Sequence, residues 1–154
     1  MLVQIYARYY IEELIEKGEF PPNTAVISFC DYGTHPCDHV NFSGVCNRIM
    51  YVEVDDLDLE DIDDCDEFLP EAKEIAEFII DAYNGGMNII CQCECGESRS
   101  AGCAAAIEEY FNRTGINVFK NYRYYPNKMI YNKIFDAMNA LEKRVYYHTG
   151  ALIA

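Results

Sequence analysis

Residues 89–100, IICQCECGESRS, hold three cysteines at alternate positions, followed by a glycine, an arginine and two serines. Cys93 is separated from Arg99 by five residues, and Ser100 follows directly. A thiolate can attack phosphorus, and an arginine fork can hold two phosphoryl oxygens. A serine hydroxyl can donate a hydrogen bond to the sulfur when it departs. This spacing predicts phosphoryl chemistry centred on Cys93.

The segments on either side of these residues predict how they are positioned. The apolar run 87–93 indicates a strand, and the Ala-rich segment 98–115 indicates a helix that ends at a glycine. A tight loop between strand and helix would turn its amides, together with the positive end of the helix dipole, toward a bound anion and favour the thiolate. A glycine in the loop allows a positive φ and a close approach to the ligand. The predicted phosphate-binding loop comprises Glu94, Cys95, Gly96, Glu97 and Ser98.

Along the rest of the chain, segments with the apolar pattern of a strand alternate with segments that have the apolar pattern of a helix. Alternating or continuous apolar residues predict strands, and apolar residues three or four apart predict helices. Strands that alternate with helices of these lengths are typical of an α/β domain whose central sheet is mostly parallel and flanked by helices. We therefore predict one domain over 1–154, which begins with a strand, a helix and a strand in 1–29 and ends in a tail, 144–154, of no readable role. The further predicted segments are strands at 2–7, 24–30 and 47–54 and helices at 8–18, 67–86 and 127–144.

Composition narrows the classes of partner. The chain has 26 acidic and 12 basic residues and a formal charge of −14, which opposes binding to nucleic acid or to an anionic membrane. No apolar run approaches the roughly 18–20 residues that cross a bilayer, and charged residues interrupt the N-terminal segment where a secretory signal would need an apolar core. We expect a cytoplasmic protein whose eight cysteines are reduced.

The motif CECGESRS at 93–100, together with YYPN at 124–127, resembles the cysteine-based protein tyrosine and dual-specificity phosphatases. The resemblance extends over about 30–144 and is closest to small bacterial or phage members of the dual-specificity-like branch. It implies a phosphatase fold and hydrolysis through a phosphocysteine on Cys93, with Arg99 and the loop amides on the phosphoryl group. It implies no metal and no cofactor. The implied substrate is a phosphorylated protein or a small phosphate ester, and the oligomeric state stays open.

The family resemblance also implies a general acid, an aspartate on a separate loop. Asp55, Asp56 and Asp58 follow the strand predicted at 47–54. Several relatives use the second residue of an acidic pair at this place, which favours Asp56. Asp58 is the next candidate, and Asp55 and Asp61 remain alternatives.

Two supporting positions are also of interest. Relatives usually have a histidine before the nucleophile, whereas this chain has Gln92. Its amide can still hydrogen-bond loop carbonyls, but the electrostatic help of an imidazole would be missing. Asn127, in YYPN, either positions the neighbouring loop or caps the last helix, and residue preference favours the cap.

Three other classes of function compete with this interpretation. A zinc site would need ligands around Cys91, Cys93 and Cys95, but the third lies in the turn and no histidine is near in sequence, since His35, His39 and His148 are remote. Buried packing is expected for Cys91 and for Cys103. A sulfur-transfer or redox protein could use the same loop with Cys95 as a resolving thiol. A phosphate-binding protein without activity is the third alternative, because of Gln92.

Overall fold

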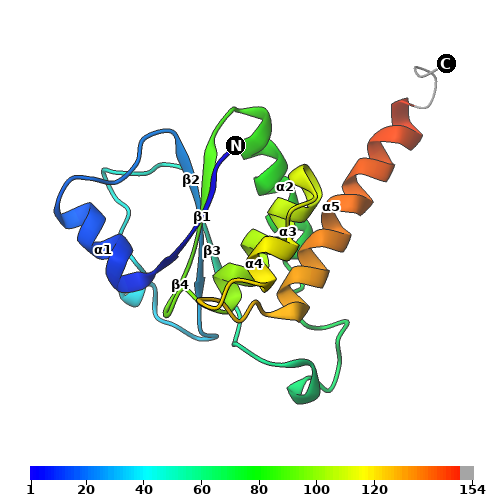
Figure 1. Ribbon diagram of the computed structural model, residues 1–154, viewed down its shortest axis with the longest axis horizontal. Helices are drawn as coiled ribbons and strands as arrows, with labels where there is room; N and C mark the ends of the chain where they lie inside the picture. The colour runs from blue at the N-terminus through cyan, green and yellow to red at the C-terminus, as the bar shows by residue number, and fades with distance from the viewer. Residues whose placement is uncertain (150–154) are drawn as a thin grey trace.

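Four short apolar segments form one parallel sheet in this computed structural model, which describes the backbone of residues 1–149 and the side chains of residues 1–143. The sheet order is β1-β4-β2-β3 (Figure 1). Every pair of neighbouring strands is parallel, so all four carboxyl ends lie at one edge of the sheet. The strands are β1 (Val3–Ala7), β2 (Thr24–Cys30), β3 (Ile49–Glu53) and β4 (Asn88–Cys93).

Helices cover both faces of the sheet, which is why the central strands are apolar along their whole length. Figure 1 shows α1 on one side of the sheet and α2, α3 and α5 on the other. The helices are α1 (Arg8–Glu16), α2 (Ala72–Asn84), α3 (Arg99–Asn112), the short α4 (Ile116–Phe119) and α5 (Lys128–Thr149). Two short 3₁₀ turns, η1 (Pro36–Asp38) and η2 (Leu59–Asp61), lie in the loops before and after β3.

The residues of β4 divide between two hydrophobic cores, as the alternation of a strand requires. Ile89, Cys91 and Cys93 belong to the larger core, which also holds the buried faces of α2, α3 and α5. Ile90 belongs to the smaller core together with Ile11 of α1. The face of the strand that carries Cys93 is therefore the face that packs against α3.

The predicted fold class is confirmed: the chain is a single α/β domain with a parallel sheet and helices on both faces. Boundaries differ at two helices. The helix expected within 67–86 begins only at Ala72, after Leu69 takes a positive φ of 52° and Pro70 follows it, since both interrupt helical geometry. The last helix continues from the predicted end into the tail up to Thr149. Residues 150–154 of the predicted tail lie outside the described residues.

Cys91 and Cys103 are fully buried in the larger core, as predicted for packed cysteines. The hydrogen bond between Cys91 and Cys103, followed by burial, raises the pKa of Cys91 well above its ordinary value. All eight cysteines are free thiols.

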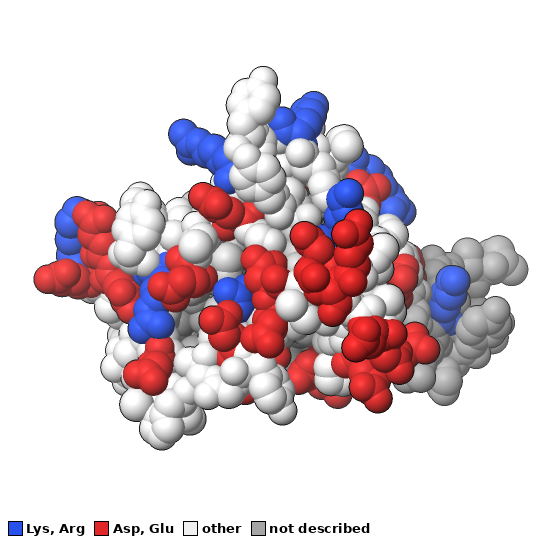
Figure 2. All heavy atoms as spheres, turned by 90° about the horizontal axis from the view of Figure 1, so that it is seen from below, with Lys and Arg blue, Asp and Glu red and all other residues white. Residues whose placement is uncertain are grey.

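Acidic side chains dominate one face of the molecule. Figure 2 views the molecule from below, where the long loop after β3 lies in Figure 1, and shows Asp and Glu over much of this face. Separately, no helix within residues 1–149 combines the length and the apolar character that a bilayer span requires.

Candidate active site

The thiol of Cys93 lies at the end of β4, directly beneath the loop that leads into α3. Its side chain is buried, with 3% of the residue exposed. The Sγ atom is 3.0 Å from Oγ of Ser100, which lies in the first turn of α3 and is fully buried. The hydroxyl is thus placed to donate a hydrogen bond to a thiolate at this sulfur.

Gly96 allows the loop to turn tightly against the first strand. Its φ is +67°, a conformation that favours glycine. A Cβ atom at this position would lie 2.5 Å from the backbone nitrogen of Ala7 and 2.8 Å from the carbonyl carbon of Tyr6. The backbone nitrogen of Arg8 also donates to the Glu94 carbonyl at 3.1 Å. The junction of β1 and α1 therefore supports the loop from behind.

Arg99 is the first residue of α3, and only 6% of it is exposed. Its Nη1 donates to Oδ1 of Asp31 at 2.7 Å and to the carbonyl of Val54 at 2.9 Å. Its Nε is buried and has no hydrogen-bond partner in the described part of the chain. A buried donor without a partner is costly, and an anion bound at the loop would satisfy it.

Asp56, the first candidate for the general acid, lies beside the predicted phosphate-binding loop. Its Oδ1 accepts hydrogen bonds from Oγ of Ser98 at 2.7 Å and from Nδ2 of Asn127 at 2.9 Å. Its Oδ2 has no hydrogen bond to any described residue, and the side chain is exposed. One oxygen is thus fixed while the other is free to carry a proton.

The other candidate acids are placed differently. Oδ1 of Asp55 accepts from the backbone nitrogen of Tyr32 at 3.0 Å, so it is bound to the loop after β2. Asp58 and Asp61 are exposed at the start and the end of η2. Neither carboxylate forms a hydrogen bond with 93–100 within the described chain.

Asn127 has both of the roles that the sequence left open. Its Oδ1 accepts from the backbone nitrogen of Ile130 at 3.0 Å and so caps α5, while its Nδ2 holds Asp56 and donates to the Leu57 carbonyl at 3.0 Å. The backbone nitrogen of Asn127 also donates to the Ser98 carbonyl at 3.0 Å. Asn127 is buried, with 3% of the residue exposed. It connects the loop that carries Asp56, the predicted phosphate-binding loop and α5.

Gln92 is buried and accepts a hydrogen bond from Oγ of Ser28 on the neighbouring strand. The expectation that its amide reaches loop carbonyls is not met, because the residue before Cys93 points to the opposite face of the sheet. Gln92 therefore fixes β4 against β2.

Glu94, Cys95 and Glu97 lie on the exposed rim of the loop. A groove of about 980 Å³ opens beside Cys95 and Glu97 and runs along β1. Cys93, Arg99 and Asp56 do not line this groove, so the predicted catalytic side chains lie outside it.

Sequence reasoning missed Asp31, although 73% of its side chain is exposed and it forms the ion pair with the buried Arg99. The residue directly follows β2, and in a parallel sheet the position after any strand lies at the same edge as the end of β4. That topological rule was the available signal.

Comparison with known proteins locates the fold. No protein-family model and no curated protein sequence matches the chain. Human DUSP28 matches in structure with a TM-score of 0.57 and 16% identity over 92% of this chain and 94% of that one. A mouse dual specificity phosphatase solved with zinc tungstate gives a TM-score of 0.55 and 16% identity over 93% and 86%.

PTPMT1 in complex with PI(5)P gives a TM-score of 0.53 and 11% identity over 94% of each chain. The chain spans nearly the full length of all three structures. At these identities the likeness concerns the fold alone. The chain has the α/β fold of the dual-specificity phosphatases.

Proposed function

We propose that this protein is a phosphomonoester hydrolase of the protein tyrosine and dual-specificity phosphatase type, which works through a phosphocysteine intermediate on Cys93. One observation carries the proposal: the buried Nε of Arg99 has no hydrogen-bond partner among the residues that the structure describes, and the Cys93 sulfur nearby already contacts Ser100. This arrangement supports a bound phosphoryl group better than it supports a packed core. The narrower assignment to a small bacterial or phage branch remains a prediction.

In the first step, Sγ of Cys93 attacks phosphorus as a thiolate and an S–P bond forms. The bond between phosphorus and the ester oxygen breaks, and that oxygen takes a proton from Oδ2 of Asp56. Arg99 Nε and the loop amides stabilise the charge on the equatorial oxygens. The alcohol leaves, and the phosphoryl group stays on the sulfur.

In the second step, water attacks the phosphocysteine and gives a proton to the Asp56 carboxylate. The S–P bond breaks, the sulfur departs as a thiolate, and inorganic phosphate is released. The Ser100 hydroxyl, 3.0 Å from the sulfur, stabilises that thiolate by a hydrogen bond. All of the steps use side chains of this chain.

The acidic rim bears on the substrate. Glu94 and Glu97 are exposed beside Cys93, and Figure 2 shows Asp and Glu over much of one face of the molecule. We infer a phosphorylated protein with basic or neutral residues next to the phosphate, because an acidic flank would be repelled. Small phosphate esters remain substrates of the same chemistry.

The test is hydrolysis of an aryl phosphate by the reduced protein in the presence of EDTA. We expect turnover that survives the chelator and falls to background in Cys93→Ser. Cys65→Ser is the matched control, because that thiol is exposed and lies outside the site, and it should retain wild-type activity. Activity that persists in Cys93→Ser, or that EDTA abolishes, would refute the mechanism. Phosphopeptide binding without turnover would support the inactive phosphate-binding alternative.

A further inference from the structure

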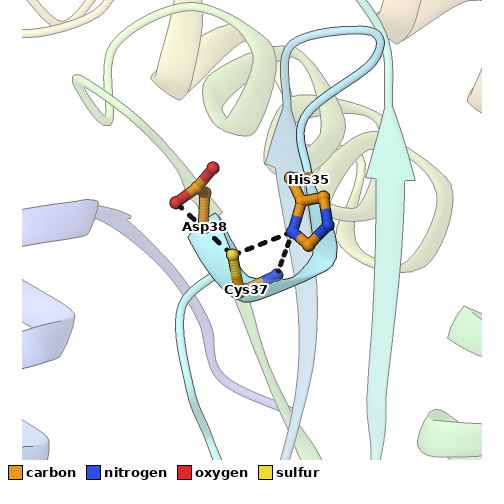
Figure 3. Close-up of side chains that lie close together, drawn as sticks. All are labelled: His35, Cys37 and Asp38. Carbon is orange, nitrogen blue, oxygen red and sulfur yellow. Dashed lines mark hydrogen bonds between the residues drawn. The ribbon is translucent and has the colours of Figure 1, made fainter.

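A second group of chemically reactive side chains lies in the loop between β2 and β3, outside the proposed catalytic residues. His35, Cys37 and Asp38 each offer one ligand atom, and these three atoms lie within 4.8 Å of one another (Figure 3). Nδ1 of His35 is 2.8 Å from Sγ of Cys37, and that sulfur is 3.9 Å from Oδ1 of Asp38. All three residues are exposed. One nitrogen, one sulfur and one oxygen thus converge at the surface.

The spacing of the three atoms is close to what a transition metal requires. Zinc binds imidazole nitrogen at about 2.0–2.1 Å, thiolate at about 2.3 Å and carboxylate oxygen at about 2.0–2.2 Å. Ligands of a tetrahedral ion at these distances are separated by roughly 3.5 Å. Small side-chain rotations would therefore bring His35, Cys37 and Asp38 to that separation. Thiolate and imidazole disfavour Mg²⁺ and Ca²⁺ as the occupant.

The backbone of this turn is already held in shape. The backbone nitrogen of Asp38 donates to the His35 carbonyl at 2.8 Å, and Pro36 fixes the first position of η1. The Asp38 carbonyl accepts from Nη1 of Arg8 at 2.7 Å, which fastens the turn to α1. The backbone nitrogen of Cys37 donates to Nδ1 of His35 at 3.2 Å, so the lone pair of that ring nitrogen faces the cluster. Preorganisation of this kind lowers the entropic cost of binding.

We propose that His35 Nδ1, Cys37 Sγ and Asp38 Oδ1 form a surface site for a zinc-class transition-metal ion, with water as the fourth ligand. On binding, the Cys37 thiol releases its proton to solvent and the metal takes the place of the Cys37 backbone N–H as the partner of His35. The negative charge of the chain, −14, favours cation binding in general. The site is independent of the proposed phosphatase activity.

Sequence reasoning did not find this site. It compared the histidines with the cysteines of 91–95, whereas His35 and Cys37 are two residues apart and Asp38 follows at once. The His-x-Cys-Asp order was therefore the available signal. The structure supports this signal, because the ligand atoms of the three side chains lie within 4.8 Å of one another (Figure 3).

Titration of the reduced, metal-free full-length protein with Co²⁺ tests the proposal, since Co²⁺ replaces zinc and gives a thiolate charge-transfer band. We expect one equivalent to produce the band and equimolar Zn²⁺ to displace it. His35→Ala and Cys37→Ser should lower the affinity by more than about 10-fold, because even the loss of a supporting partner costs about 10- to 100-fold. Cys65→Ser, which removes another exposed thiol, should bind as the wild type does.

Cys93→Ser separates the proposed site from the catalytic thiol. Retention of the band in this variant supports the surface site. Loss of the band in Cys93→Ser, with retention in Cys37→Ser, would overturn the proposal and assign the metal to the nucleophile. Absence of a band in the wild type would overturn it as well. Equal melting temperatures of the metal-free variants will show that their folds are intact, which the exposure of all three ligands leads us to expect.

Discussion

Arg99 is the residue whose surroundings say most about the site. Its Nη1 donates to two acceptors, Asp31 and the Val54 carbonyl, while its buried Nε has no partner within the described part of the chain. An unsatisfied buried donor costs about 1–3 kcal/mol, so the free protein carries a cost that an oxyanion would relieve. Asp56 shows the same division at the other side of the site: its Oδ1 accepts from Ser98 and Asn127, while its Oδ2 has no hydrogen bond to a described residue. In each residue, hydrogen bonds fix one polar atom and leave another available to a ligand.

Asp56→Asn tests the proposed role of Asp56 as the general acid. We expect kcat to fall by about 10²- to 10⁴-fold, the usual range for loss of acid–base catalysis. The loss should be larger for an alkyl phosphate than for a nitrophenyl phosphate, because a poor leaving group needs the proton more. Steady-state rates on both substrates measure the effect. Asp58→Asn is the control, and a greater loss in that variant would transfer the role to Asp58.

The predicted phosphate-binding loop is held in place by other elements of the fold. The β1–α1 junction supports it through Arg8 and the close contact at Gly96, and the start of α5 binds it through Asn127. The Ser28–Gln92 hydrogen bond fixes β4 beneath it. Amides held in this way need little reorganisation when an anion binds, which is the condition for electrostatic catalysis.

Gly96→Ala should disturb the loop more than a positive φ alone explains. The matched variant is Gly86→Ala, since Gly86 has a similar φ of +68° but no atom within 4 Å of an added Cβ. Strain at positive φ costs about 1 kcal/mol or more in both. Overlap with Ala7 should add a further ~1–3 kcal/mol for Gly96→Ala. Urea unfolding measures the difference, and equal midpoints would show that the loop yields without cost. Activity should fall only in Gly96→Ala.

Across the whole molecule, much of the fold was predictable because the spacing of apolar residues along the chain distinguishes strands from helices. β4, the loop and α3 are contiguous in sequence, so Cys93, Gly96 and Arg99 were found together. Contacts between distant segments were not predictable in the same way. Asp31 is 68 residues from Arg99, and Asp56 is 71 residues from Asn127. Such pairs depend on strand order and on the packing of α5, which periodicity does not encode.

Three thiols with a raised pKa make the stability of the folded state depend on pH in the alkaline range. The pKa of Cys91 is raised well above its ordinary 9.0 by the Cys103 hydrogen bond and by burial, and burial also raises the pKa of Cys30 and of Cys46. Above about pH 9 the unfolded chain releases these protons while the folded chain keeps them. The contribution of these thiols to the free energy of unfolding should therefore be constant below that pH and fall above it.

Cys91→Ala removes the contribution of Cys91 to this pH dependence of stability. The wild type should lose up to about 1.4 kcal/mol per pH unit more than the variant as the pH rises past 9. Urea unfolding of both proteins between pH 8 and 10.5 (about the range set by the ordinary thiol value) measures the two slopes. The smaller side chain will lower the stability of the variant at every pH, so the slope is the readout. Parallel slopes would contradict the assigned shift.

The proposed mechanism depends on a phosphocysteine at Cys93, and this intermediate can be trapped. Wild type and Asp56→Asn are mixed with an aryl phosphate, quenched in acid, digested and examined by mass spectrometry. We predict a phosphoryl group on the peptide that contains Cys93, with more of it in Asp56→Asn because that variant lacks the base for hydrolysis. A phosphoryl group on another residue, or turnover with no adduct in either protein, would contradict the proposed phosphocysteine mechanism.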